Sequence, residues 1–186
     1  MRILLFLLCI ACMLVFSSCS HKWKNYTIKA GSHSKTEISK PLVEADEIEF
    51  RFRTNDSWYY SPPSSPGWNK IRGFSHGHHH DNSSARLGYQ CLNDTLLVVG
   101  GYCYANGVSP QDNPAQKGII DTIATDSEYH CRIKWENGKY KFYFEDKYWE
   151  APAGTYKSWG YKLNPYIGGN FVLDHDWYTQ IKDLKP

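Results

Sequence analysis

The chain has 186 residues, of which 41% are hydrophobic, 22% charged and 16% aromatic, and its formal net charge is +2 at pH 7. This composition excludes disordered and collagen-like chains, and six cysteines are too few for a disulfide-dense scaffold. Positive and negative residues alternate through most of the sequence, so the charge pattern gives no sign of a nucleic-acid partner. The length suits one globular domain behind a leader.

Residues 1–18 have the layout of a secretory signal peptide, with Arg2 before an apolar run over residues 3–16. That run is shorter than the about 20 residues of a membrane-spanning helix. Phe16-Ser17-Ser18-Cys19 resembles the lipobox of bacterial lipoproteins, with Phe16 in place of the usual aliphatic residue. The resemblance implies lipidation of Cys19 and, because Ser20 rather than aspartate follows, anchoring at the outer membrane. Simple secretion is the alternative, and the leaflet stays open.

Residues 19–42 are polar and basic, and we expect them to form a lipidated tether with a possible first strand. From position 43 to 186, short runs of aromatic and β-branched residues alternate with turn signals, and no segment keeps a helical period. The expected strands cover 47–53, 70–75, 85–91, 95–104, 118–122, 129–135, 139–145, 163–168 and 177–184. Such regular spacing predicts an all-β sandwich or barrel. Three cysteines follow the leader, so at most one disulfide can form among Cys91, Cys103 and Cys131.

A loop after the first of these strands gathers large aromatic rings. Trp58, Tyr59 and Tyr60 stand before a proline- and serine-rich stretch, and Trp68 follows it. Rings on a loop suit sugar recognition, because a pyranose offers an apolar face for stacking and hydroxyls for hydrogen bonds. These rings are therefore candidate sugar-stacking residues. The alternative is that Trp58 or Tyr60 folds back and caps one end of the core.

Residues 76–81 read His-Gly-His-His-His-Asp and lie between two predicted strands. Neutral imidazoles are common metal ligands, and alternate histidines of an extended segment point the same way. A metal site would combine His78 and His80 with Asp81, or with His175 from the corner that precedes the last strand. For His175, an ordinary polar corner is favoured over a metal ligand. No other cofactor is expected.

Asn93-Asp94 marks a turn between the predicted strands 85–91 and 95–104. A two-residue turn there would bury Leu87, Tyr89, Cys91, Leu96, Val98 and Tyr102 on one face. Arg86 and Gln90 would then share the opposite face with Leu97 and Val99. This mixed face is typical of a concave, ligand-binding sheet, so Arg86 and Gln90 become candidate ligand contacts. His76, His78 and Asn106 in the adjoining segments are further candidates.

Asn137-Gly138 is a strong hairpin signal, and a two-residue turn there pairs residues whose numbers add to the same total. Trp135 then faces Tyr140, and Cys131 faces Phe144. The apolar residues of both runs fall on one face and the charged ones on the other, as in an antiparallel pair with one buried side.

The run of short strands, the hairpin over 129–145 and the closing Asn164-Pro165-Tyr166-Ile167-Gly168-Gly169-Asn170 together resemble the second half of a concanavalin A-like (laminin-G-like) jelly roll. The resemblance covers residues 43–186. It implies a two-sheet antiparallel sandwich and a carbohydrate as the broad class of ligand.

The favoured interpretation is a membrane-anchored envelope lipoprotein whose jelly-roll domain binds a glycan, a binding module rather than an enzyme. The candidate ligand contacts are Trp58, Tyr59, Tyr60, Trp68, His76, His78, Arg86, Gln90 and Asn106.

Two alternatives stay open. The same concave face would suit a polysaccharide lyase or a glycoside hydrolase. A lyase would use Arg86 with His76 or His78 and with Tyr102 or Tyr104, and a hydrolase would need paired carboxylates. The third interpretation is a structural envelope module that binds another protein.

Overall fold

The computed structural model describes residues 22–37, 39–61 and 67–185. The predicted signal peptide and the candidate lipidation site Cys19 lie outside the described residues. Within those ranges, no helix is long and apolar enough to cross a membrane.

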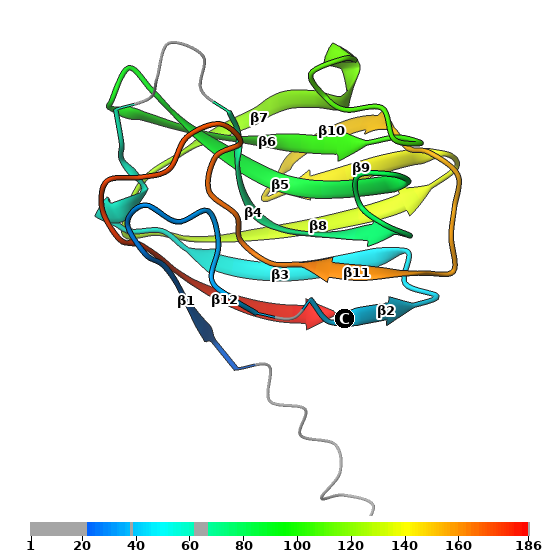
Figure 1. Ribbon diagram of the computed structural model, residues 1–186, viewed down its shortest axis with the longest axis horizontal. Coiled ribbons are helices and arrows are strands. Elements are labelled where there is room, and N and C mark those ends of the chain that lie inside the picture. The colour runs from blue at the N-terminus through cyan, green and yellow to red at the C-terminus, as the bar shows by residue number, and fades with distance from the viewer. Residues whose placement is uncertain (1–21, 38, 62–66, 186) are drawn as a thin grey trace, which may run out of the picture.

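Two six-stranded antiparallel sheets stack face to face in the described part of the chain (Figure 1). The first sheet contains, in spatial order, β1 (Lys24–Ile28), β12 (Trp177–Lys185), β3 (Glu47–Arg53), β8 (Glu128–Glu136), β9 (Lys139–Phe144) and β10 (Lys147–Pro152). The second contains β2 (Pro41–Val43), β11 (Trp159–Leu163), β4 (Asn69–His76), β5 (Ser83–Leu92), β6 (Leu96–Tyr104) and β7 (Lys117–Ile123). Two short 3₁₀ helices, η1 (Asp56–Trp58) and η2 (Pro114–Gln116), lie in the connections. The predicted all-β, two-sheet antiparallel sandwich is confirmed.

The β8–β9 hairpin has the predicted register. Trp135 pairs with Tyr140 and Cys131 with Phe144. Asn137 and Gly138 both have positive φ angles, as a tight two-residue turn of this kind requires. The turn and the alternation of apolar residues therefore agree, and the apolar side of both strands lies in the core.

The predicted register of the β5–β6 hairpin is wrong by one residue. Both residues of Asn93-Asp94 have positive φ angles, but the loop is one residue longer than expected, so Cys91 pairs with Leu97. Because successive side chains of a strand point to opposite faces, this shift reverses the facing of β6. Leu97 lies in the core, and Tyr102 lies on the outer face with Arg86.

The predicted strand over 163–168 is also wrong. Strand β11 ends at Leu163, and beyond it Tyr166 forms an isolated bridge with Lys70. Pro165 has no N–H to donate to a strand ladder. The segment 19–42, predicted as a tether with a possible first strand, contributes β1 and the start of β2 to the sandwich.

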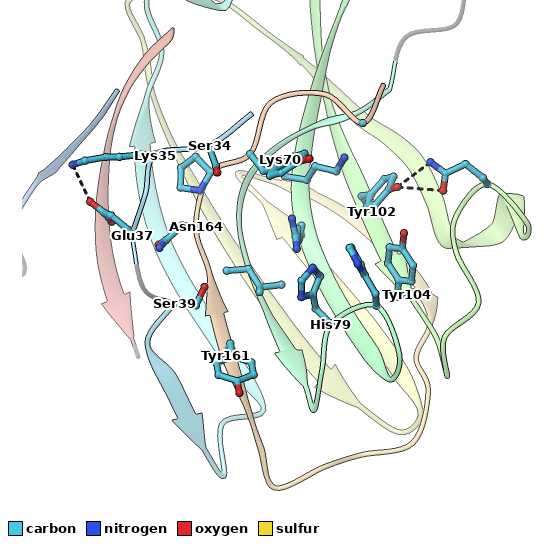
Figure 2. A pocket seen from close by; sticks show the side chains of 17 residues that line it. Ser34, Lys35, Glu37, Ser39, Lys70, His79, Tyr102, Tyr104, Tyr161 and Asn164 are labelled. Carbon is cyan, nitrogen blue, oxygen red and sulfur yellow. Dashed lines mark hydrogen bonds and ion pairs between the residues drawn. The ribbon is translucent and has the colours of Figure 1, made fainter. Parts of the chain in front are cut away.

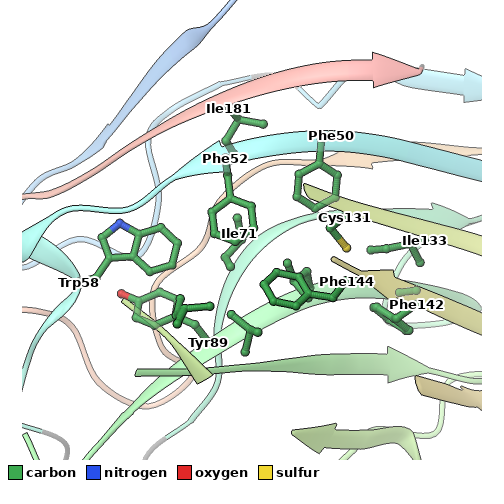
Figure 3. Close-up of a cluster of buried hydrophobic side chains, with 14 of the residues drawn as sticks. Phe50, Phe52, Trp58, Ile71, Tyr89, Cys131, Ile133, Phe142, Phe144 and Ile181 are labelled. Atoms are coloured by element: carbon green, nitrogen blue, oxygen red, sulfur yellow. The ribbon is translucent and has the colours of Figure 1, made fainter. Parts of the chain in front are cut away.

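The core fills the space between the sheets and is rich in aromatic rings (Figure 3). Phe50 and Phe52 reach it from β3, while Ile71 and Tyr89 reach it from β4 and β5. Cys91, Cys103 and Cys131 are all buried and free. These three thiols act as small apolar fillers of the core.

Candidate functional site

A cavity of about 770 Å³ is hollowed into the outer face of the second sheet (Figure 2). Side chains from β4, β5 and β6 form its floor. Tyr161 on β11 and Tyr166 in the following loop line one side, and Lys35 and Glu37 come from the segment before β2. On the far side, the Gln111 amide donates a hydrogen bond of 2.9 Å to the hydroxyl of Tyr102.

The strand register explains why this part of the sheet is hollow. Two rows of paired residues cross it, Leu163-Gly73-Arg86-Tyr102 and Ser75-Ser84-Tyr104. Glycine and serine occupy the middle strands of these rows. The two serines are small, and at Gly73 a Cβ would meet the backbone of Ala85. Arg86 is therefore the one long side chain at the centre of the two rows.

Two cationic side chains, Lys70 on β4 and Arg86 on β5, lie at the floor of this cavity. Both are largely buried, with Lys70 7% and Arg86 9% exposed. The Lys70 ammonium donates to the carbonyl of Gly168 at 3.0 Å and stands 4.6 Å from the ring centroid of Tyr102. Within the described ranges of the chain, neither cation forms an ion pair with a carboxylate.

Burial without an acidic partner changes the protonation equilibrium of both groups. Burial and the neighbouring charge of Arg86 lower the pKa of Lys70 to about 7, and burial lowers the pKa of Arg86 to about 10. Buried charges are normally paired, because taking a charge out of water is unfavourable. An anion that enters the cavity would therefore be stabilised by both groups.

Arg72, on the same strand as Lys70, shows the usual arrangement of a buried arginine. Its guanidinium donates to both carboxylate oxygens of Asp183, at 3.1 and 2.6 Å, and to the amide oxygen of Asn164 at 2.6 Å. Lys162 also contacts Asp183, at 3.2 Å. This cluster ties β4 to β12 of the other sheet and gives Arg72 a carboxylate partner, whereas Arg86 has none among the described residues.

Two histidines and Tyr104 line the cavity beside Arg86. The rings of His79 and His80 are 3.9 Å apart, and that of His80 is 5.1 Å from the ring of Tyr104. Burial and the charge of Arg86 lower the pKa of both histidines, that of His79 to about 4. Burial also raises the pKa of Tyr104 to about 12. At neutral pH these rings offer hydrogen-bonding groups without adding charge.

The loop aromatics predicted to stack on a sugar are not exposed. Trp58 is fully buried, with its ring 5.3 Å from that of Trp177. Tyr60 and Trp68 are each 7% exposed, and Tyr59 packs against the core. The prediction of an exposed stacking platform is therefore wrong. Trp58 and Tyr60 fold back into the core, which is the alternative that the sequence left open.

The polar candidates are divided between the cavity and other places. Arg86 lines the cavity, together with Tyr102 and Tyr104, the tyrosines named for a lyase. His76 is buried between the sheets, with its ring nitrogens 3.1 Å from the Tyr140 hydroxyl and 3.2 Å from the Ala45 carbonyl oxygen, so its assignment as a ligand contact is wrong.

The remaining polar candidates do not line the cavity. Gln90 is half-buried on β5, opposite Val98. Asn106 follows β6, where its side-chain oxygen accepts a hydrogen bond of 2.7 Å from the backbone N–H of Thr155. His78 is exposed beside Trp159.

The candidate metal ligands are not brought together. His80 lines the cavity, whereas His175 hydrogen-bonds through its ring to Asp174 and to the carbonyl of Ser57. Among the residues that the structure describes, no group of three or more His, Cys, Asp or Glu side chains could hold a metal ion.

Sequence reasoning missed Lys70, His79 and the two tyrosines Tyr161 and Tyr166. Lys70 begins a predicted strand and has no local pattern that separates it from exposed lysines. Tyr166 lay in a segment predicted as a strand, and Tyr161 lay just before it. A useful signal was available in the alternation of small and large residues along 69–76 and 83–92, since glycine within a strand often marks a place where another molecule approaches.

No protein-family model and no curated protein matches the sequence. In fold, the chain is similar to alginate lyase Aly36B, with a TM-score of 0.59, 14% identity, and 86% of this chain and 78% of that chain covered. It is similar to the marine PL7 alginate lyase AlyA1 from Zobellia galactanivorans, with a TM-score of 0.59, 11% identity, and coverage of 87% and 75%. A functionally unknown protein from Saccharomyces cerevisiae gives a TM-score of 0.54 at 10% identity, with 89% and 96% covered.

At these identities the likeness shows the fold alone. The alginate lyases are jelly-roll proteins, so the predicted jelly-roll class is confirmed.

Proposed function

We propose that the protein binds an acidic polysaccharide in the cavity on the second sheet, with Lys70 and Arg86 as the groups that receive its carboxylates. The observation that carries this proposal is the pair of buried cations that share one open cavity and have no acidic partner among the residues that the structure describes. A uronate carboxylate supplies the missing charge and accepts hydrogen bonds from a guanidinium in a bidentate manner.

The lining of the cavity favours a sugar as the carrier of that carboxylate. Tyr102, Tyr104, Tyr161 and Tyr166 present apolar ring surface and hydroxyl groups, the combination that a pyranose needs. The structural neighbours are consistent with this choice, since variants of alginate lyase Aly36B are known in complex with an alginate trisaccharide and an alginate tetrasaccharide.

The test is titration calorimetry of the purified protein with alginate, polygalacturonate and, as a neutral control, laminarin. We expect binding of at least one acidic polymer and none of laminarin. Arg86→Met should weaken binding by roughly 30-fold or more, the usual result of removing one member of a buried charge pair. Arg51→Met, on the outer face of the other sheet, is the matched control and should leave affinity unchanged. Equal affinity for the neutral polymer, or for Arg86→Met, would overturn the proposal.

A second candidate function is cleavage of the same polymer by β-elimination, and the observation that favours it is the pKa of Lys70 near 7 beside Arg86 and Tyr102. Neutral Lys70 would take the C5 proton of a uronate while Arg86 balances its carboxylate. The C4–O4 bond then breaks, a C4=C5 double bond forms, and a tyrosine hydroxyl supplies the proton to the departing oxygen.

The new double bond absorbs in the ultraviolet, so product formation is followed directly. A lyase would give a rate that rises with pH through about 7 and is lost in Lys70→Met. Tight binding with no unsaturated product would leave the protein a binding module.

For localisation, we propose a lipoprotein anchored to the outer membrane through Cys19. The support is the lipobox-like Phe16-Ser17-Ser18-Cys19 after an apolar leader. Several acyl chains would hold the domain at a membrane, because each buried methylene contributes about 0.8 kcal/mol. Cys19→Ala should move the protein from the membrane fraction to the soluble fraction, and an unchanged distribution would refute the anchor.

A further inference from the structure

Two exposed rings and the half-buried ring of Tyr161 lie together at the N-terminal end of β11. Trp159 on β11 and His78 after β4 are 5.2 Å apart between ring centroids, edge to face. Tyr161, which lines the cavity, is 6.1 Å from Trp159 and 6.3 Å from His78. Because alternate residues of a strand share a face, Leu163, Tyr161 and Trp159 form a row that runs from the cavity outward.

These rings are pre-arranged and open to solvent. Trp159 is 42% exposed, and Val43, its pairing partner on β2, is 75% exposed. Single exposed apolar residues need no explanation, but a group of rings in mutual contact is a feature of binding surfaces. Because the rings brace one another, little side-chain entropy is lost when a ligand binds on them.

The cavity suggests what covers this surface. Tyr161 belongs to both features, so a polymer held by Lys70 and Arg86 can continue directly onto Trp159. The distance across the sheet from β6 to β11 spans three strand spacings, or about 14 Å. A ligand that extends from Tyr102 past Arg86 to Trp159 is therefore a chain of several sugars.

We propose that Trp159, Tyr161 and His78 form an aromatic subsite that stacks the apolar face of a pyranose in the same polysaccharide chain whose carboxylate enters the cationic cavity. The inference rests on the proposed function and adds to it the length of the ligand and its direction across the sheet. The cavity supplies charge recognition, and the aromatic subsite supplies stacking on a further sugar unit.

The test compares a disaccharide and a hexasaccharide of alginate, and the same two lengths of polygalacturonate, by titration calorimetry. Trp159→Ala should lower affinity for the hexasaccharide by roughly tenfold and leave the disaccharide unaffected, whereas Trp159→Phe should recover most of the loss. Tyr148→Ala removes a ring that is 51% exposed on β10 of the other sheet, and it should change neither affinity. Thermal unfolding of each variant shows that it is folded.

Each remaining outcome has one meaning. If Arg86→Met abolishes binding while Trp159→Ala leaves hexasaccharide affinity intact, the aromatic subsite is refuted and the cationic site stands. Equal losses for both lengths in Trp159→Ala would show that the ring acts on the cavity itself and would overturn a separate subsite. If the wild-type protein binds neither acidic series, the aromatic subsite falls together with the proposed function.

Discussion

The outer faces of the two sheets use the same residue types in opposite ways. On the first sheet, Arg51 and Arg53 both bind Glu128, at 3.0 and 2.9 Å, and Glu136 lies between Lys134 and Lys141. These groups are exposed or half-exposed, and each charge has an opposite partner beside it. Such exposed pairs add little stability.

On the second sheet, Lys70 and Arg86 are buried and close to one another, and neither pairs with a carboxylate of residues 22–37, 39–61 or 67–185. Composition cannot distinguish the two faces, because both carry lysine, arginine, histidine and tyrosine. The difference lies in whether the chain supplies the counter-charge. Where it does not, the folded state retains an unfavourable interaction that a ligand can relieve, and the proposed function rests on this difference between the two faces.

The largest expected effect is a difference in stability between variants of two buried arginines, Arg72 and Arg86. Arg72→Met should lower the free energy of unfolding by about 2–4 kcal/mol, because it leaves Asp183 with Lys162 as its remaining ion-pair partner. Arg86→Met should leave the free energy of unfolding unchanged or raise it, since within the described part of the chain its buried guanidinium forms no ion pair with a carboxylate. Urea unfolding of both variants at neutral pH measures the difference.

The comparison of the two faces is contradicted if Arg86→Met destabilises the protein more than Arg72→Met does. A large destabilisation by Arg86→Met would mean that its guanidinium holds the sheet together, and its unpaired state would then not indicate a ligand. Methionine is chosen for both positions because it keeps most of the aliphatic stem and limits the cavity left behind.

A smaller effect is expected from Lys70. Its folded-state pKa of about 7 lies below the ordinary 10.5, so the unfolded chain binds more protons between these values. Stability contributed by this group therefore rises with pH across that window, and the unfavourable charge is fully present below pH about 7. Lys70→Met should stabilise the protein by about 0.5–2 kcal/mol at acidic pH and by less near pH 10.

To test this, unfolding free energies of the wild type and of Lys70→Met are measured at acidic pH and near pH 10. Lys147→Met, at an exposed lysine of β10, serves as the control and should show no such pH-dependent gain. A gain from Lys70→Met that is constant with pH would mean that packing, rather than charge burial, limits the wild type.

The sequence predicted most of the fold where local signals agreed. At Asn137-Gly138 the turn residues and the apolar alternation require the same register, and the structure has it. At Asn93-Asp94 the loop was one residue longer than the turn signal suggested, and a one-residue shift was enough to place Tyr102 on the wrong face. Loop length is set by how the strands pack, and the local sequence did not determine it.

The site was predicted only in part, for a related reason. Arg86 was assigned correctly to the outer face, but Trp58 was read as a sugar-stacking ring although it lies in the core. A tryptophan in a loop has the same local sequence whether the loop stands out or folds back. Lys70 was missed because its burial and its missing partner depend on Gly168 and on β5 and β6, which are distant in sequence.

The smallest expected effect is proton uptake on binding. A bound carboxylate favours the charged form of Lys70 and raises its pKa, while the ligand's own carboxyl groups stay ionised near pH 8. Since free Lys70 is mostly neutral at that pH, we expect an uptake of about one proton per ligand near pH 8 and none near pH 5. Calorimetry in buffers of different ionisation enthalpy measures this number.

Lys70→Arg separates this lysine from every other titrating group. Arginine keeps the positive charge and stays protonated, so the variant should still bind but without the uptake near pH 8. His79 does not interfere, because burial lowers its pKa to about 4, so far below pH 8 that the ring stays neutral when a carboxylate binds nearby. If Lys70→Arg takes up as many protons as wild type, the ligand does not approach Lys70. Arg86, without Lys70, would then be the group that receives the carboxylate.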